Sequence, residues 1–220
     1  MTQKIYDIRT ASQREFEDFV FDHDPQSFAT NDAWYHRLDT TVKYDASHSA
    51  RCFIEMFRTS ASLFEKYDRE RLKQGFWAMT GASFDGNLDI LIWRSNIAPE
   101  LKEELIAAMF FVFCDVFARD PMGEACEMWW DALAYCINPM KHVDPVGNPV
   151  HKRIQGAMFH TLAQILDLDA ADCQSAALHG LNHVLHPDTK ALIDDFIMRR
   201  PDLPQDFIDY AYHCVAGRAM

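Results

Sequence analysis

The stretch CQSAALHGLNHVL, residues 173–185, decides the fold, because its apolar spacing occurs twice earlier in the chain, in residues 125–137 and 154–166. When the segments are superposed, large apolar residues fall at three shared positions: Trp130, Phe159 and Leu178; Leu133, Leu162 and Leu181; Ile137, Leu166 and Leu185. An amphipathic helix needs a neighbour that covers its apolar stripe. The recurrence therefore predicts stacked helical repeats.

Prolines mark where several helices are expected to begin. The first position of a helix needs no amide hydrogen, which favours starts at Pro99, Pro121, Pro149, Pro187 and Pro204. Apolar periodicity predicts helices over 11–22, 31–37, 47–66, 68–80, 87–95, 98–119, 121–138, 149–166, 170–185, 187–200 and 204–219. Alternation of the strand type is nearly absent. The expected fold is all-α, a HEAT/armadillo-like right-handed superhelix of antiparallel helix pairs.

The whole chain, residues 1–220, is expected to form a single α-helical repeat domain, because no low-complexity linker divides it. Residues 1–46 would form an N-terminal helical cap, and residues 47–220 would form the HEAT-like helices. Segment 98–119 carries apolar residues on all sides, so it is expected to be the central core helix.

Composition indicates a cytoplasmic protein. The six cysteines form no CxxC pair and lie in or beside apolar stretches, which is typical of a reducing compartment. The N-terminus lacks the apolar core of a signal peptide, and the longest apolar run, 105–114, is too short to cross a bilayer. A net charge of −12 argues against nucleic acid and suits a basic protein partner. The oligomeric state stays open.

Three short motifs resemble a group of uncharacterised bacterial proteins with HEAT- or armadillo-type helical folds. They are QGFW at residues 74–77, MWWD at 128–131 and CQSAALHGLNH at 173–183. The resemblance covers about residues 50–215 and implies an all-α superhelix with no established activity. It supplies no catalytic residue, so none is assigned.

Histidines of the last repeat are the residues in which metal chemistry would be sought. His179, His183 and His186 have i, i+4 and i+7 spacing, which places them on one side of a helix. A His-x-x-x-His pair can chelate zinc, but most such sites need a third or fourth ligand. The sequence cannot place a carboxylate such as Asp131 or Asp188 beside the pair. We therefore expect no metal and no cofactor, and histidines that cap, pack or face solvent.

The repeat alignment also proposes a binding surface. Asp131 and His179 fall at one aligned position, and Tyr135 and His183 fall at another, four residues later. If the two helices are equivalent members of successive hairpins, these four residues line one surface, the candidate binding surface. The alternative is that polar residues occupy these positions because they form the wet side of each helix.

Common enzyme motifs are missing from the sequence, which contains no GxGxxG, GxxxxGK(S/T), HExxH or GxSxG. The favoured function is a non-enzymatic protein-binding scaffold or adaptor, comparable to acidic immunity-type proteins. A metal-dependent enzyme that uses the face of His179, His183 and His186 is the alternative. A HEAT-like DNA-binding protein is the third class, and it would need basic residues such as Lys152 and Arg200 on one concave face.

Overall fold

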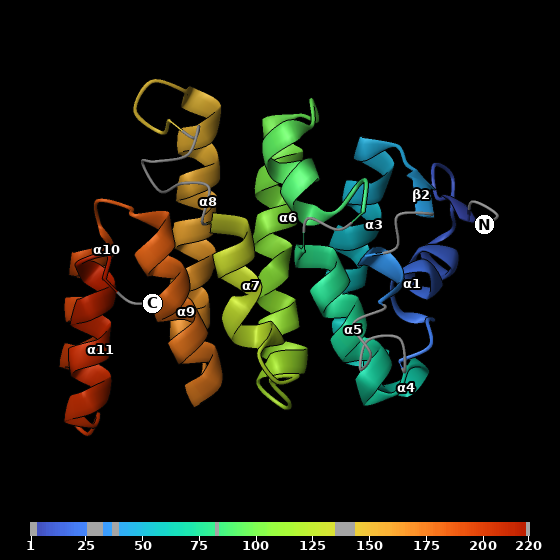
Figure 1. The fold of residues 1–220 in the computed structure, drawn as a ribbon. Coiled ribbons are helices and arrows are strands. Elements are labelled where there is room, and N and C mark those ends of the chain that lie inside the picture. Colours follow the sequence, from blue (N-terminus) through green and yellow to red (C-terminus); the bar gives the residue numbers. More distant parts are fainter. Residues whose placement is uncertain (1–3, 26–32, 37–39, 82–83, 135–143, 219–220) are drawn as a thin grey trace. The chain divides into compact units, whose positions relative to one another are not determined.

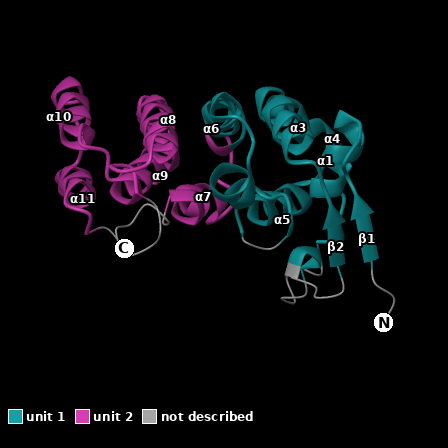
Figure 2. Cartoon of the chain, turned by 90° about the horizontal axis from the view of Figure 1, so that it is seen from above, with its two compact units in different colours: residues 1–116 teal, residues 117–220 magenta. Residues whose placement is uncertain are grey.

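The computed structural model describes residues 4–25, 33–36, 40–81, 84–134 and 144–218, which are mostly helical. The all-α expectation is confirmed at this level. The chain divides into two compact units, residues 1–116 and 117–220, which Figure 2 shows in different colours. Among the described residues, no helix is both long and apolar enough to cross a membrane.

Unit 1 joins a small sheet to a set of helices (Figure 1). Its elements are β1 Lys4–Asp7, α1 Gln13–Phe21, β2 Thr40–Lys43, α3 Ala46–Arg58, α4 Leu63–Lys66, α5 Arg69–Thr80, a π-helical turn Ile90–Arg94 and α6 Pro99–Val112. A capping box begins α1, since the Ser12 hydroxyl accepts from the Glu15 amide and the Glu15 carboxylate accepts from the Ser12 amide. Aromatic side chains of α1 and α3 fill the core of this unit.

The two strands are a feature that the sequence did not predict. β1 pairs in parallel with β2, with Lys4 opposite Thr40 and Asp7 opposite Lys43. Each strand has four residues, and of these eight only Val42 is buried, so neither strand offers the apolar alternation by which a strand is recognised. Pairing between segments distant in the sequence supplies the stabilisation that the local pattern lacks.

The apolar segment 98–119 is central to unit 1 only in part. α6 packs along α3 and buries Leu105, Ile106 and Met109 completely. Phe111 remains 38% exposed, so one side of the segment is open to solvent. The α-helix ends at Val112 and a π-helical turn follows at Phe113–Phe117.

Unit 2 is built around one helix, α9. Its elements are α7 Ala125–Ala134, α8 Pro149–Leu166, α9 Ala171–Val184, α10 Thr189–Arg199 and α11 Gln205–Val215 (Figure 1). Helices α7, α8 and α11 each pack on α9, and α10 packs on α11. Trp129 and Trp130 of α7 are both fully buried, which confirms the core position expected for Trp130.

Of the helix starts that were predicted at prolines, the start at Pro149 is correct and the start at Pro121 is wrong. α8 begins at Pro149 as predicted, with the Asn148 side chain capping the amides that follow. The predicted start at Pro121 was wrong, because α7 begins at Ala125. Met122 and Gly123 have φ values of 54° and 66°, which an α-helix cannot contain. The single domain and the superhelical arrangement stay predictions.

Candidate functional site

Asp131, His179 and His183 meet in unit 2, although they come from two helices. Nε2 of His183 lies 2.8 Å from Oδ1 of Asp131 and 3.1 Å from Nε2 of His179. Nε2 of His179 lies 3.6 Å from the same carboxylate oxygen. Within the described residues, this is the group of three side chains whose ligand atoms are close enough to share a metal ion. We call it the Asp-His-His cluster.

Helix geometry explains how the cluster forms. His179 and His183 stand one turn apart on α9, which places both rings on one face, with ring centroids 4.8 Å apart. Asp131 reaches the pair because α7 packs along α9. The repeat alignment gave Asp131 and His179 equivalent places on their own helices. These places face each other where the helices touch.

Gly180 allows the two helices to come this close. A Cβ atom at this position would lie 2.8 Å from Cβ of Trp130 and 2.6 Å from Cδ2 of Leu162, both far inside ordinary van der Waals contact. Gly180 follows His179, and Trp130 precedes Asp131, so the closest approach of α7 and α9 lies beside the cluster. A side chain at residue 180 would separate the ligand atoms.

The side chains of the Asp-His-His cluster are more buried than those of a surface that docks another protein. The side chains of His179 and His183 are 8% and 12% exposed, whereas that of Asp131 is 30% exposed. Burial lowers the pKa of His183 and the neighbouring His179 lowers it too, while Asp131 acts in the opposite direction. The cluster is therefore reached from solvent on the Asp131 side. A cluster of this kind can bind an ion or a small molecule more readily than it can bind the surface of another protein.

His186, which was expected on the same face as His179 and His183, does not belong to the cluster. α9 ends at Val184, and Leu185 takes a left-handed conformation with φ of 51°, so helical spacing no longer applies to His186. The ring of His186 stacks on Phe159 with centroids 4.1 Å apart. The expectation of one face with three histidines was therefore wrong for His186. Tyr135 of the candidate binding surface lies outside the described residues.

Tyr210 of α11 contacts the cluster from the opposite side of His179. Its hydroxyl oxygen lies 3.5 Å from Nδ1 of His179, and it also hydrogen-bonds with Ser175 and Cys214. Burial raises the pKa of Tyr210. Sequence reasoning missed this residue, because α11 lies outside the three repeated segments and no spacing relates it to α9.

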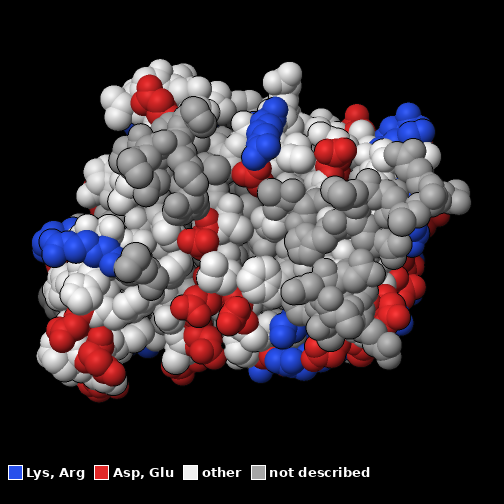
Figure 3. Space-filling model, viewed as in Figure 1, with Lys and Arg blue, Asp and Glu red and all other residues white. Residues whose placement is uncertain are grey.

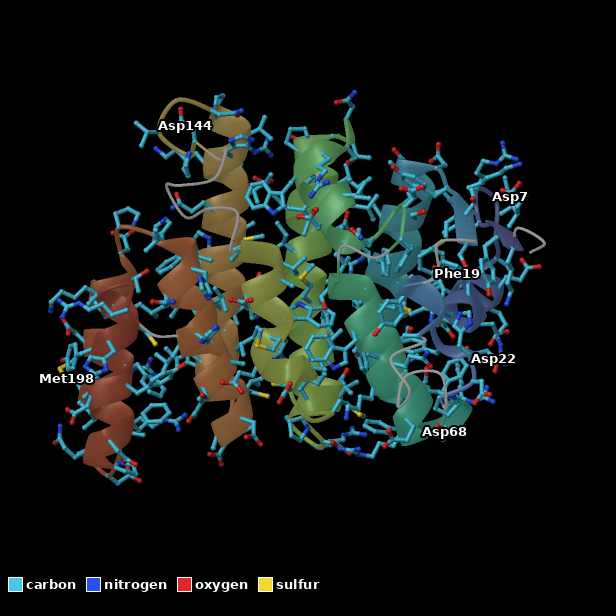
Figure 4. The ribbon with its side chains drawn as sticks, viewed as in Figure 1. Asp7, Phe19, Asp22, Asp68, Asp144 and Met198 are labelled. Atoms are coloured by element: carbon cyan, nitrogen blue, oxygen red, sulfur yellow. The ribbon has the colours of Figure 1, made fainter. Side chains whose placement is uncertain are left out.

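A hollow of about 500 Å³ lies in unit 1 beside α1 and β1. Asp7, Phe19 and Asp22 are among its lining residues and are labelled in Figure 4. Asp7 forms an ion pair of 2.6 Å with Arg9, and Asp22 pairs with Arg71. The charges of these two carboxylates in the hollow are thus neutralised by Arg9 and Arg71.

Basic side chains are scattered on the face that Figure 3 shows, in small groups with acidic side chains between them. Arg199 of α10, the neighbour of Arg200, pairs with Asp195 at 2.8 Å and with Asp167 at 3.0 Å. Its charge is already compensated within unit 2.

No known protein family, curated protein or solved structure matches this chain. The chemistry of the Asp-His-His cluster therefore carries the functional conclusion. Two imidazole nitrogens and one carboxylate oxygen can hold a divalent transition metal, and they can exchange protons with a bound water.

Proposed function

We propose that the chain is a metalloprotein in which Asp131, His179 and His183 bind one divalent transition-metal ion. The observation that supports the proposal is the convergence of three ligand atoms from α7 and α9, all within 4.8 Å of one another. Zinc and iron(II) both accept this donor set. We therefore prefer the metal-dependent function that the sequence offered as an alternative, with Asp131 as the third ligand instead of His186.

The separations between the ligand atoms suit a tetrahedral ion. Bonds of about 2.0–2.1 Å at tetrahedral angles hold neighbouring ligand atoms about 3.3 Å apart. The three separations here are 2.8, 3.1 and 3.6 Å, which scatter about that value. Small side-chain rotations are enough to seat an ion between them.

Three protein ligands leave the fourth position of such an ion for water, as in catalytic zinc sites. The exposed side of Asp131 gives this position access to solvent. A metal ion held by Asp131, His179 and His183 would lower the pKa of a bound water and so would supply a nucleophile near neutral pH. The proposal therefore extends to a hydrolytic enzyme.

Metal titration of untagged protein tests the proposal. The protein is stripped with a chelator and titrated with zinc by calorimetry, and the bound metal is counted by elemental analysis. The variants are Asp131→Asn and His183→Gln, and the control is His213→Gln, which replaces an exposed histidine of α11. Wild type and control should bind one equivalent. Zinc binding should weaken in Asp131→Asn and His183→Gln. The loss should exceed the roughly 10–100-fold that is typical when a residue outside the first shell is changed.

The proposal fails if wild-type protein binds no stoichiometric metal, or if Asp131→Asn and His183→Gln bind as tightly as wild type. Circular dichroism of each variant separates the loss of a ligand from the loss of the fold. Cobalt(II) in place of zinc adds a visible spectrum that reports tetrahedral coordination. Zinc-dependent release of nitrophenol from an activated ester tests the hydrolytic part by itself.

Two expectations from the sequence remain predictions beside the metal proposal. The HEAT- or armadillo-like superhelix is supported by the packing of α7, α8 and α11 on α9 and by the pairing of α10 with α11. The protein-binding scaffold is an independent prediction, and the enclosed Asp-His-His cluster does not supply its surface.

A further inference from the structure

We infer that Cys126 and Cys173 form a dithiol site, which a small uncharged hydroperoxide such as hydrogen peroxide oxidises to a reversible disulfide. Both thiols are free in the structure. The inference goes beyond the proposed metal function and does not depend on it, because neither cysteine belongs to the Asp-His-His cluster.

The two cysteines meet where α7 packs on α9. Sγ of Cys126 lies 3.9 Å from the carbonyl oxygen of Asp172, the residue that precedes Cys173. The thiols of Cys126 and Cys173 are also hydrogen-bonded to each other. A disulfide needs its two sulfur atoms about 2.0 Å apart. Thiols that already touch across packed helices can reach this separation by side-chain rotation.

Both cysteines stand in the first turn of their helices. Cys126 is the second residue of α7, and Cys173 is the third residue of α9. The amide groups of a first turn have no partner inside the helix, and with the helix dipole they stabilise a thiolate. Because the thiolate is the form of cysteine that reacts, this position favours attack on an oxidant.

A small cavity gives an oxidant access to the pair, although both cysteines are buried. Its volume is about 90 Å³, and its lining includes Cys126, Gly123, Glu127 and Asp172. The last three residues are exposed, so the cavity opens to solvent. It has room for a few molecules the size of water. The two carboxylates repel anions, so the cavity favours neutral hydrogen peroxide over glutathione disulfide, which is larger and negatively charged.

The oxidation takes two steps and consumes one molecule of hydrogen peroxide. In the first step a thiolate of the pair attacks one peroxide oxygen. The O–O bond breaks, a sulfenic acid forms, and the departing hydroxide takes up the thiol proton as water. In the second step the other sulfur attacks the sulfenic sulfur. The S–O bond breaks, the second thiol proton leaves in another water, and the new disulfide joins α7 to α9.

Peptide mapping after peroxide treatment tests the inference. Reduced, untagged wild-type protein is treated with hydrogen peroxide, denatured, alkylated and digested with trypsin. Cys126 lies in tryptic peptide 120–141 and Cys173 in peptide 154–190. We expect wild type to lose two of its six alkylatable thiols and to yield these two peptides joined. Dithiothreitol should separate the joined peptides.

Single variants assign the bond, because peptide 120–141 also contains Cys136. Cys126→Ser and Cys173→Ser should give no joined peptide, whereas the control Cys52→Ser should give it as wild type does. Cys52 lies in the middle of α3, where burial raises the pKa of its thiol to about 11. Circular dichroism shows whether each variant keeps the fold, and the thiol count of wild type needs no variant.

Glutathione disulfide in place of peroxide tests the role of the cavity. At equal concentration it should oxidise the pair more slowly than hydrogen peroxide, and equal or faster oxidation overturns access through the cavity. A wild type that keeps all six thiols after peroxide treatment, or a joined peptide that persists in Cys126→Ser, overturns the dithiol site itself. None of these results bears on the Asp-His-His cluster, which metal titration tests separately.

Discussion

Replacing Gly180 by alanine should destabilise unit 2 through the contact between α7 and α9. The new Cβ would lie 2.8 and 2.9 Å from Cβ and Cγ of Trp130, where ordinary contact begins at 3.4 Å. The Trp130 Cβ is bonded to the backbone and cannot rotate away, so the helices must move apart by about half an ångström. Overpacking of this kind costs about 1–3 kcal/mol.

Gly156→Ala provides the matched control. Gly156 lies inside α8, and a Cβ there would meet nothing within 4 Å. Both substitutions gain roughly 1 kcal/mol in helix propensity, because alanine is a better helix former than glycine. The difference in stability between the two variants is then the overpacking cost alone, roughly 1–3 kcal/mol.

Thermal unfolding followed by circular dichroism measures this difference. For a chain of this size 1 kcal/mol corresponds to roughly 2–4 °C, so Gly180→Ala should melt about 2–12 °C below Gly156→Ala. Equal melting temperatures would show that α7 and α9 have room for a side chain. The packing explanation for the Asp-His-His cluster would then be wrong.

Two further predictions concern the core and the response to pH. Trp130→Ala should lose about 3–5 kcal/mol in urea unfolding, because the indole is fully buried, and a loss below about 1 kcal/mol would contradict its core position. Burial lowers the pKa of His23 from about 6.5 to about 4, so between these values the unfolded chain binds more protons than the folded one. Stability should be full above pH 6.5 and fall by up to about 3 kcal/mol as the pH drops to 4. His23→Phe should flatten this dependence while its ring still stacks on Trp34, and an unchanged slope in urea unfolding across this range would contradict the assignment.

Local signals predicted most of the helices. The periodicity of α8 and the proline at its start agree, and its predicted bounds, 149–166, are those of the structure. Pro121 has the same local signal, but the left-handed residues Met122 and Gly123 delay the helix. The strand pair was missed because its stabilisation comes from pairing across more than thirty residues of chain. Periodicity within a short window contains no such information.

The site was predictable to the extent that it follows helical spacing. His179 and His183 share a face because they are one turn apart, and the repeat alignment singled out Asp131. That alignment could not show that Asp131 would face the histidines, since the contact depends on how α7 packs on α9. His186 was misplaced because a left-handed Leu185 ends the helical spacing before it. Tyr210 had no sequence signal at all.

The close contact at Gly180 links the stability of unit 2 to its proposed chemistry. An ion held by Asp131, His179 and His183 joins α7 to α9 at the place where Gly180 allows them to touch. Ligand binding stabilises the folded state by about 2.7 kcal/mol at a free concentration of 100 Kd. Saturating zinc should therefore raise the melting temperature of wild type. In Gly180→Ala the same zinc concentration should raise the melting temperature less. The alanine side chain holds α7 and α9 apart, so bringing the three ligands onto one ion costs free energy and weakens zinc binding.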